Sequence, residues 1–550
     1  MKTQSGRIAA ISDSVKMPLP PYLVISILTI FAIGPQYFIN LSYTMNQVII
    51  QNGLNLSSSD LLLPSTLSNI AFALGVPLGP VISRKLGVRK TYLMFVSVFL
   101  LGALINLISQ DTVSLTMGRI IQGLSSGFLF LTILPVSLKS FPNKIRNYFL
   151  LMVITGLFGA SAVGAIFGSV SLSVDAWRWL FILNIVSAVL CLIVGFLGLP
   201  HSKEEKQESE PVNKFGIFLL TVLMLMLTVP LCNVMQEGFD SLYVWPFLVA
   251  AFILMILFIV FELKAKTPLV PFRTLKAAKP ISGTVMAIAS HVCLIFAMAG
   301  INGFLRNNLD LPYRYLVHFY IWFFVGILVT AVLKTLLYDR LGAGVLGLVG
   351  SIAVIGVSLQ WRRMNPGISL NLLYFQIALL GAGVSMTLVG GALGTALAGD
   401  IHQASMRSVT LHSIRNFVGA VITPLLGWYL TRQNAVNYEE IRGRLGQHSA
   451  EAQSEIAGLI RKLMGEGVPA AQAQSTASYE LIVNAKRAAV LGAYHHLFTI
   501  MACVGVIMLL ASIGKIVTGK GRALVQQEKR LMMPKTGETE LHPSPIHITK

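Results

Sequence analysis

Long apolar segments recur along almost the whole chain and limit it to one kind of fold. A helix that crosses a bilayer needs about 20 mostly apolar residues. Segments of about that length lie at 22–44, 61–83, 92–109, 113–138, 148–171, 179–199, 215–235, 244–263, 281–304, 316–336, 343–361, 370–397, 411–431 and 495–517. Since 54% of the 550 residues are hydrophobic and 12% are charged, the chain cannot form the surface of an ordinary soluble enzyme. The sequence predicts an all-α polytopic membrane protein with about 14 transmembrane helices.

Lysine and arginine are distributed unevenly among the loops between these segments. With a cytoplasmic N-terminus, most of them fall in cytoplasmic loops, and the opposite short loops hold Arg178, Arg306, Arg314, Arg362 and Arg363. Cytoplasmic loops of membrane proteins carry such an excess of positive charge. We therefore expect both termini in the cytoplasm. The net charge of +19 is explained by lysines and arginines in loops that face anionic lipid. The expected partner is therefore the bilayer, and a nucleic acid is not expected.

The chain is predicted to divide into two six-helix halves joined by a linker with two additional spans. The predicted parts are a cytoplasmic tail 1–21, an N-terminal half 22–199, a linker 200–280, a C-terminal half 281–517 and a cytoplasmic tail 518–550. Within the second half, residues 433–494 alternate Glu with Lys and Arg. This pattern predicts exposed, outward-facing amphipathic helices, broken at Gly465, Gly467 and Pro469.

A short internal repeat supports the two halves. Arg84-Lys85-Leu86-Gly87 follows the second apolar segment, and Asp339-Arg340-Leu341-Gly342 follows the second segment of the last six. Transporters built from such repeats bind their substrate near the midplane, between the halves.

The fourth segment contains an arginine, Arg119, which is costly in an apolar helix unless it faces the protein interior or water. Gln122 lies one turn further on, and Gly123 and Gly127 allow a close helix approach. This pattern resembles the arginine–glutamine–glycine motif of the major facilitator superfamily, particularly its fourteen-span drug/proton antiporter branch. Similar stretches follow in the family's order at 141–147, 177–184, 261–272 and 403–422, so the resemblance covers roughly residues 20–520.

The resemblance implies a transporter that exports small amphipathic molecules across the bacterial cytoplasmic (inner) membrane by alternating access, in exchange for protons. The resemblance also implies that the protein is not an enzyme and uses no cofactor. The family's gating motif maps to Gly87 and Arg89, with Arg84 in place of its acidic residue, and in the second half to Asp339, Arg340 and Gly342. In span five the family's glycine–proline pair is absent, although Gly164 and Gly168 still permit tight packing.

Proton coupling needs a group that titrates within the membrane. No Asp or Glu lies deep in a predicted span, so the candidates are His291 first, then His318, His412, His495 and His496. Arg119 and Arg415 are the deepest cations, and they would favour an anionic substrate unless they bond to backbone carbonyls or nearby amides. Further candidate substrate contacts are Gln36, Tyr37, Asn40, Phe128, Phe130, Phe296, Asn302 and Tyr320. An aromatic residue on a spanning helix is more often packed or lipid-facing than in contact with a substrate.

The sequence argues against several functions other than export of drug-like molecules. No Walker loop, H-E-x-x-H or G-x-S-x-G context occurs, which argues against an ATP-driven pump and a membrane enzyme. The four cysteines lie in apolar segments without metal-site spacing, so no metal is expected. Two alternatives stay open: export of an organic anion or siderophore-like metabolite without classical proton coupling, and a nontransporting sensor or scaffold. The segment 433–494 is also a possible contact for an envelope adaptor protein.

Overall fold

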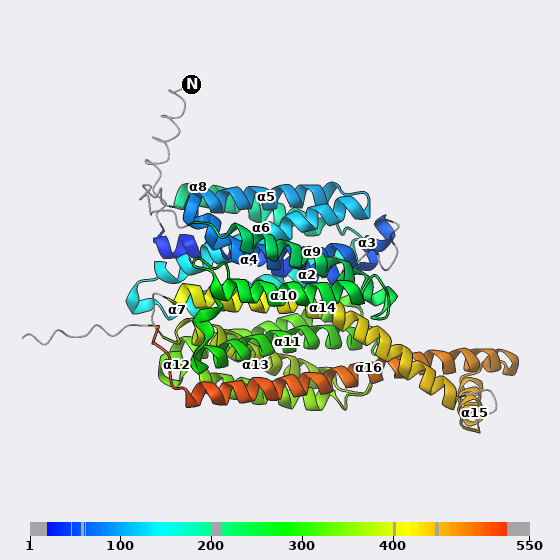
Figure 1. Cartoon of the computed structure of the whole chain (residues 1–550). Coiled ribbons are helices and arrows are strands. Elements are labelled where there is room, and N and C mark those ends of the chain that lie inside the picture. Colours follow the sequence, from blue (N-terminus) through cyan, green and yellow to red (C-terminus); the bar gives the residue numbers. More distant parts are fainter. Residues whose placement is uncertain are drawn as a thin grey trace, which may run out of the picture.

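The protein is a bundle of long α-helices that lie side by side (Figure 1). The computed structural model describes residues 19–45, 47–54, 56, 60, 62–199, 211–399, 403–445 and 450–524. Its helices are α2 (Pro21–Met45), α3 (Gln47–Leu54), α4 (Leu62–Leu86), α5 (Val88–Ile108), α6 (Thr112–Ser140), α7 (Tyr148–Ser173), α8 (Trp179–Gly198), α9 (Lys214–Glu237), α10 (Trp245–Lys264), α11 (Ala278–Asn307), α12 (Tyr313–Trp361), α13 (Leu370–Ala396), α14 (Ala404–Arg444), α15 (Ala450–Gly465) and α16 (Ala470–Val517). Two 3-10 turns, η1 (Asn143–Ile145) and η2 (Phe272–Leu275), complete them, and the described residues form no β-strand.

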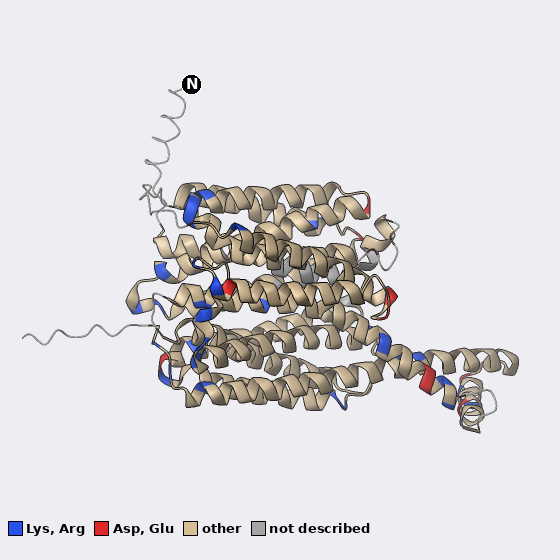
Figure 2. Cartoon of the chain, viewed as in Figure 1, with Lys and Arg blue, Asp and Glu red and all other residues tan. Residues whose placement is uncertain are grey.

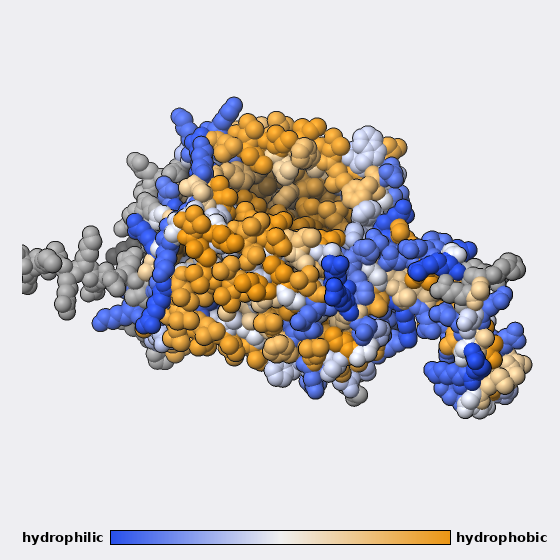
Figure 3. Space-filling view, turned by 90° about the horizontal axis from the view of Figure 1, so that it is seen from below, coloured by the Kyte–Doolittle hydropathy of each residue, from blue (hydrophilic) through white to orange (hydrophobic). Residues whose placement is uncertain are grey.

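The predicted all-helical membrane fold is confirmed. Among the described residues, 11 helices are long and apolar enough to cross a membrane, and α2 and α7 contain shorter apolar stretches. Every apolar segment identified in the sequence overlaps a helix. Hydrophobic side chains cover the middle of the face seen in Figure 3, between hydrophilic ends. The exact number of fourteen spans stays a prediction.

The sequence repeat marks the same backbone conformation in both halves. Gly87, between α4 and α5, has φ 78° and ψ 154°. Gly342, inside α12, has φ 77° and ψ 170° and divides this helix of 49 residues into two helical parts. At 1.5 Å per residue, α12 would be roughly 74 Å long, more than twice the thickness of a bilayer core. It is therefore long enough for the two crossing segments that the sequence predicted at 316–336 and 343–361.

The described residues of the segment 433–494 form a helical arm that projects from one end of the bundle (Figure 1). It consists of the end of α14, helix α15 and the beginning of α16, and the chain turns at Gly467, where φ is 90°. The predicted amphipathic helices are therefore present, but two of them are continuous with spanning helices. The arm is tied to the bundle by an ion pair between Arg487 and Asp310 and by a 2.9 Å hydrogen bond from Asn308 Nδ2 to the Arg487 carbonyl.

Most lysines and arginines gather at the end of the bundle opposite the arm (Figure 2). There α6 ends, α7 and α11 begin, and α16 ends. We call this the basic end, and it includes Lys139, Arg146, Lys279, Arg340 and Lys520. Two contacts bind the chain after α16 to this end: Lys520 Nζ donates to the Arg340 carbonyl, and the Leu524 amide donates to Asp339 Oδ1 over 2.9 Å.

Helices α4 and α6 cross at a seam of glycines. A Cβ added to Gly123 or Gly127 would collide with the carbonyl oxygens of Ser68 and Phe72 on α4. In the reverse direction, a Cβ added to Gly75 would lie 2.6 Å from the carbonyl oxygen of Leu124 on α6. Small residues at both surfaces let the two backbones come into contact. The predicted packing role of Gly123 and Gly127 agrees with this arrangement.

Candidate functional site

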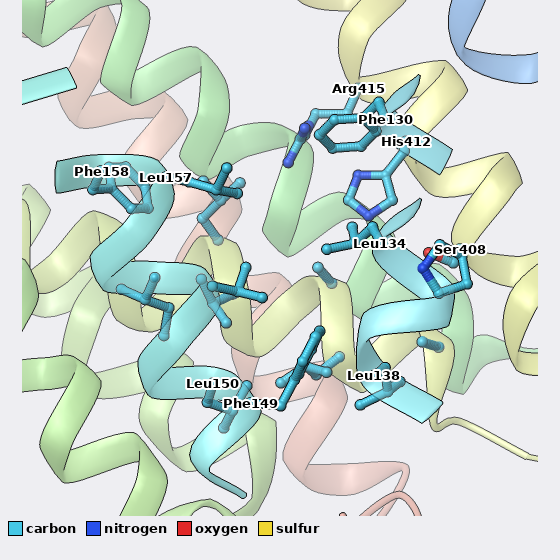
Figure 4. Close-up of a pocket in the computed structure, with 18 of the residues that line it drawn as sticks. Phe130, Leu134, Leu138, Phe149, Leu150, Leu157, Phe158, Ser408, His412 and Arg415 are labelled. Atoms are coloured by element: carbon cyan, nitrogen blue, oxygen red, sulfur yellow. The ribbon is translucent and has the colours of Figure 1, made fainter. Parts of the chain in front are cut away.

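A cavity of about 760 Å³ lies in the interior of the bundle (Figure 4). Its walls come from α6 and α7 in the predicted N-terminal half and from α11, α12, α13 and α14 in the predicted C-terminal half. The cavity therefore lies between the two halves that the sequence repeat suggested. A volume of this size suits a drug-sized organic molecule.

The walls of the cavity are mostly apolar. Large side chains that line it are Leu134 and Leu138 of α6, Phe149, Leu150, Leu157 and Phe158 of α7, and Leu294, Met298, Phe323, Phe324 and Leu388 of the second half. Pockets of this kind hold an apolar ligand body by excluding water from it.

The cavity reaches the basic end. Lys139, Arg146, Ala404 and Leu524 belong to its lining, and they lie at or beyond the ends of their helices on that side. Along α6 the lining runs from Phe130 to Lys139, which corresponds to about 13 Å along the helix axis. A molecule in the cavity would thus meet cationic side chains near the mouth and apolar walls further in.

Four of the lining side chains lie on α6, α11 and α14, and we call them the inner site: Phe130, His291, His412 and Arg415. The Cζ atom of Arg415 lies 5.7 Å from the ring centroid of Phe130, within the range of a cation–π contact. The rings of Phe130 and His412 meet edge to face, with centroids 5.1 Å apart. Figure 4 shows these three side chains together, beside the apolar wall.

The polar atoms of the inner site are buried in the protein. His412 and Arg415 are each 7% exposed. Arg415 Nη2 donates a long hydrogen bond of 3.4 Å to Asn416 Oδ1, and His412 Nδ1 has no hydrogen-bond partner among the described residues. Buried polar atoms without a partner are rare, and a catalytic role or a bound water or ion is among the explanations for them. The inner site can therefore offer hydrogen-bond donors to a ligand.

The helices that line the cavity have no carboxylate near the inner site. Helices α6, α7, α11 and α13 contain no Asp or Glu, α12 has Asp339 at the basic end, and α14 has Glu439 and Glu440 in the arm. The charged side chains of the cavity lining are thus Lys139, Arg146 and Arg415. Its electrostatic character is cationic.

The predicted site residues fall into two groups. His291 and Arg415, with Phe130, His412 and Tyr320, line the cavity. Arg119 and Gln122 are fully buried in α6, outside the lining, and Gln122 Oε1 accepts a 2.7 Å hydrogen bond from Asn106 Nδ2 of α5. Phe128, Phe296 and Asn302 are outside the lining too, and the side chains of Gln36, Tyr37 and Asn40 lie outside the described residues.

The predicted gating residues contact neighbouring segments at the basic end. Arg89 Nη2 donates to the Phe196 carbonyl over 2.6 Å, whereas Asp339 and Arg340 hold the chain after α16, as described above. Gly164 and Gly168 are buried in α7. These positions agree with a role in helix packing and in contacts between segments, and their gating role stays a prediction.

Two groups of residues were missed by sequence reasoning. The mouth cations Lys139 and Arg146 were assigned to a loop, because sequence alone does not show that this loop borders a cavity. Lys334 of α12 is fully buried, and its Nζ atom donates to the Ser385 carbonyl and hydroxyl over 2.7 and 2.6 Å. Its position in an apolar segment was the available signal.

Comparison with known proteins identifies transporters of one superfamily. The model of the Major Facilitator Superfamily matches residues 25–424. The MFS-type transporter YubD of Bacillus subtilis (strain 168) is 30% identical over 416 residues, which are 75% of this chain and 81% of YubD. The quinolone resistance protein NorB of Staphylococcus aureus (strain MRSA252) is 32% identical over 180 residues, which are 32% of this chain and 38% of NorB.

Two solved structures share the fold. One is a bacterial homologue of the human lysosomal transporter Spinster in an inward-facing, unoccupied conformation, with a TM-score of 0.53, 13% identity and coverage of 92% of this chain and 99% of that one. The other is the human organic anion transporter MFSD10, with a TM-score of 0.53, 12% identity and coverage of 89% and 100%. At these identities the likeness concerns the fold alone.

Proposed function

Because this chain belongs to the major facilitator superfamily, whose members are transporters and not enzymes, we propose that it exports small amphipathic molecules across the bacterial cytoplasmic membrane. The observation that carries the proposal is the apolar cavity of about 760 Å³ between the two halves. The partial similarity to a quinolone resistance protein supports a drug-like substrate.

The shape of the cavity supports alternating access. By the positive-inside rule the basic end faces the cytoplasm, so a cavity that reaches this end is an inward-open binding site. A substrate would enter past Lys139 and Arg146, and its apolar body would contact the aromatic and leucine side chains of α6 and α7. Rocking of one half against the other would then open the site to the outside.

Exchange against protons is part of the proposal, and His291 and His412 are the residues we assign to it. Both line the inner part of the cavity, and imidazole is the side chain that changes its charge near neutral pH. The lining helices offer no buried carboxylate for this purpose. Substrate and proton would therefore compete for the same part of the cavity.

Transport by inverted membrane vesicles tests this function. With an inward-acidic proton gradient and a panel of dyes, drugs and organic anions, we expect accumulation of a panel compound together with collapse of the gradient. The variant Leu157→Trp fills the cavity and should abolish accumulation. Val163→Trp places the same side chain on α7 at a position that is 52% exposed and should leave accumulation unchanged. Wild-type vesicles that accumulate no panel compound would contradict export and favour a sensor or scaffold.

The arm is the proposed contact for an envelope adaptor protein. It projects from the end opposite the basic end, and it has a small core of its own around Leu463, Ala473 and Ala477. Replacing residues 450–465 by a short Gly–Ser linker removes α15 and keeps the contacts of Arg487. We expect export from whole two-membrane cells to fall while transport by vesicles stays unchanged. Equal export from cells with and without α15 would exclude the adaptor role.

A further inference from the structure

The charge of the substrate is the property that the inner site specifies. We propose that Arg415, His412 and His291 bind the single anionic group of an amphipathic organic acid, such as a carboxylate, and that the apolar walls hold the rest of the molecule. This inference rests on the proposed export function, which it deepens by naming the class of substrate.

The geometry of the inner site suits an anion. The position of Arg415 beside the ring of Phe130 orients its guanidinium group, which can donate two parallel hydrogen bonds to one carboxylate. His412 is 7% exposed and its Nδ1 atom has no hydrogen-bond partner among the described residues. Imidazole donates through one nitrogen when neutral and through both when protonated. Arg415 and His412 lie one helical turn apart on α14, so both can reach the same group.

His291 completes the site from the opposite helix. A Cβ atom added to Gly419 of α14 would lie 2.7 Å from His291 Nε2, so the glycine is what lets the imidazole of α11 lie against α14. All three nitrogen-bearing side chains thereby line one part of the cavity. A larger residue at position 419 would push His291 away from this helix.

The surrounding charges select for an anion and against a cation. Every charged side chain of the cavity lining is a lysine or an arginine, and the apolar parts of the lining helices have no Asp or Glu. Electrostatic interactions are strong in a low-dielectric cavity because little water screens them. An organic cation of the same size would therefore be repelled, while an organic anion would be attracted from the mouth toward the inner site.

The direction of transport fits the same charge. The cytoplasm is negative relative to the outside, so the membrane potential itself drives an anion outward. Net export of a monoanion therefore needs no membrane carboxylate, which is consistent with the absence of one from the lining helices.

Three probes with the same ring system separate charge from hydrophobicity: 2-naphthylacetate, 2-naphthylacetamide and 2-naphthylethylammonium. The full-length protein would be reconstituted in liposomes, and uptake and efflux would be measured with and without an imposed potential. We expect transport of the acetate at least tenfold faster than that of the amide and the ammonium, with a rate that changes with the potential.

Variants then assign the preference to the inner site. Arg415→Gln should reduce the acetate-to-amide ratio at least tenfold, Arg415→Lys should keep part of it, and His412→Gln should reduce it independently of Arg415. Arg432→Gln is the matched control because Arg432 is an exposed arginine on the same helix, outside the cavity lining. Retained transport of the amide reports that a variant is folded.

The possible results distinguish this inference from the export function. Faster transport of the ammonium or the amide by the wild-type protein would overturn the anion site and leave export of amphipathic molecules standing. An unchanged acetate preference in both Arg415→Gln and His412→Gln would overturn the assignment of the residues. No transport of any of the three probes, by a protein that accumulates a compound of the vesicle panel, would overturn the anion site and leave the export function standing.

Discussion

Glu262 is a buried carboxylate at the end of α10, and its role is to accept hydrogen bonds from two neighbouring segments. Its side chain is 0% exposed, and it accepts hydrogen bonds from Asn213 Nδ2 over 2.8 Å and from the Val270 amide over 2.9 Å. These contacts join the beginning of α9, the end of α10 and the segment that follows it. One carboxylate thus joins the segments at the beginning of α9 and at the end of α10.

Replacing Glu262 by alanine should destabilise this region, because the amide and the asparagine would lose their acceptor in a buried place. Such losses cost about 1–3 kcal/mol. We expect a lower midpoint of thermal unfolding in detergent for Glu262→Ala. Glu237→Ala, at the exposed end of α9, should shift the midpoint far less, and equal shifts for the two variants would contradict the structural role.

Single residues also show what the sequence can and cannot predict about the site. His291 and Arg415 were candidates because polar groups in apolar segments face the protein interior, and both line the cavity. Arg119 follows the same rule and is fully buried, yet it lies outside the cavity lining. A polar residue within an apolar segment is expected to point toward the protein interior. The sequence does not indicate which neighbouring helix that residue contacts.

At the scale of elements, the contact between α4 and α6 depends on the absence of side chains. A Cβ at Gly127 would collide with the carbonyl oxygen of Phe72, which is backbone and cannot rotate away. Overpacking of this kind typically costs about 1–3 kcal/mol. We expect Gly127→Ala to lower the thermal unfolding midpoint. Gly356→Ala adds the same methyl group on α12, where nothing lies within 4 Å. A Gly127→Ala protein as stable as Gly356→Ala would show that the helices can separate without cost.

The glycine of the internal repeat is a second element-scale requirement. Gly342 has φ 77° and ψ 170°, a conformation essentially restricted to glycine. Alanine there should cost about 1–3 kcal/mol of strain, and Gly87→Ala should cost a similar amount because Gly87 has nearly the same dihedral angles. Unfolding midpoints of both variants can be compared with Gly458→Ala, in open space on α15. A stable Gly342→Ala protein would mean that the turn adopts another conformation.

The helices themselves were predictable because a bilayer imposes one length and one composition on every crossing segment. Their ends were less predictable where a helix continues into water. The sequence placed spans at 411–431 and 495–517, whereas α14 runs from Ala404 to Arg444 and α16 from Ala470 to Val517. The polar extensions of α14 and α16 into the arm are helical because of helix propensity and packing within the arm. Hydropathy does not report either property.

At the scale of the whole molecule, the distribution of charge and the position of the cavity belong together. The cavity reaches the basic end, and the arm extends from the other end (Figures 1 and 2). Sequence indicated the charge asymmetry between loops, because each loop can be counted by itself. It could not indicate that α6, α7 and α11–α14 enclose one cavity, since that depends on how the two halves are docked.

The orientation of the molecule decides whether the cavity takes its substrate from the cytoplasm. Single cysteines at two exposed positions, Lys266 after α10 and Gln472 in the arm, report it in a background whose native cysteines are replaced by serine. Because positively charged loops stay in the cytoplasm, we expect a membrane-impermeant maleimide to label Lys266→Cys in inverted vesicles and Gln472→Cys in spheroplasts. Labelling on the opposite sides would place the cavity mouth outside the cell and turn the proposed exporter into an importer.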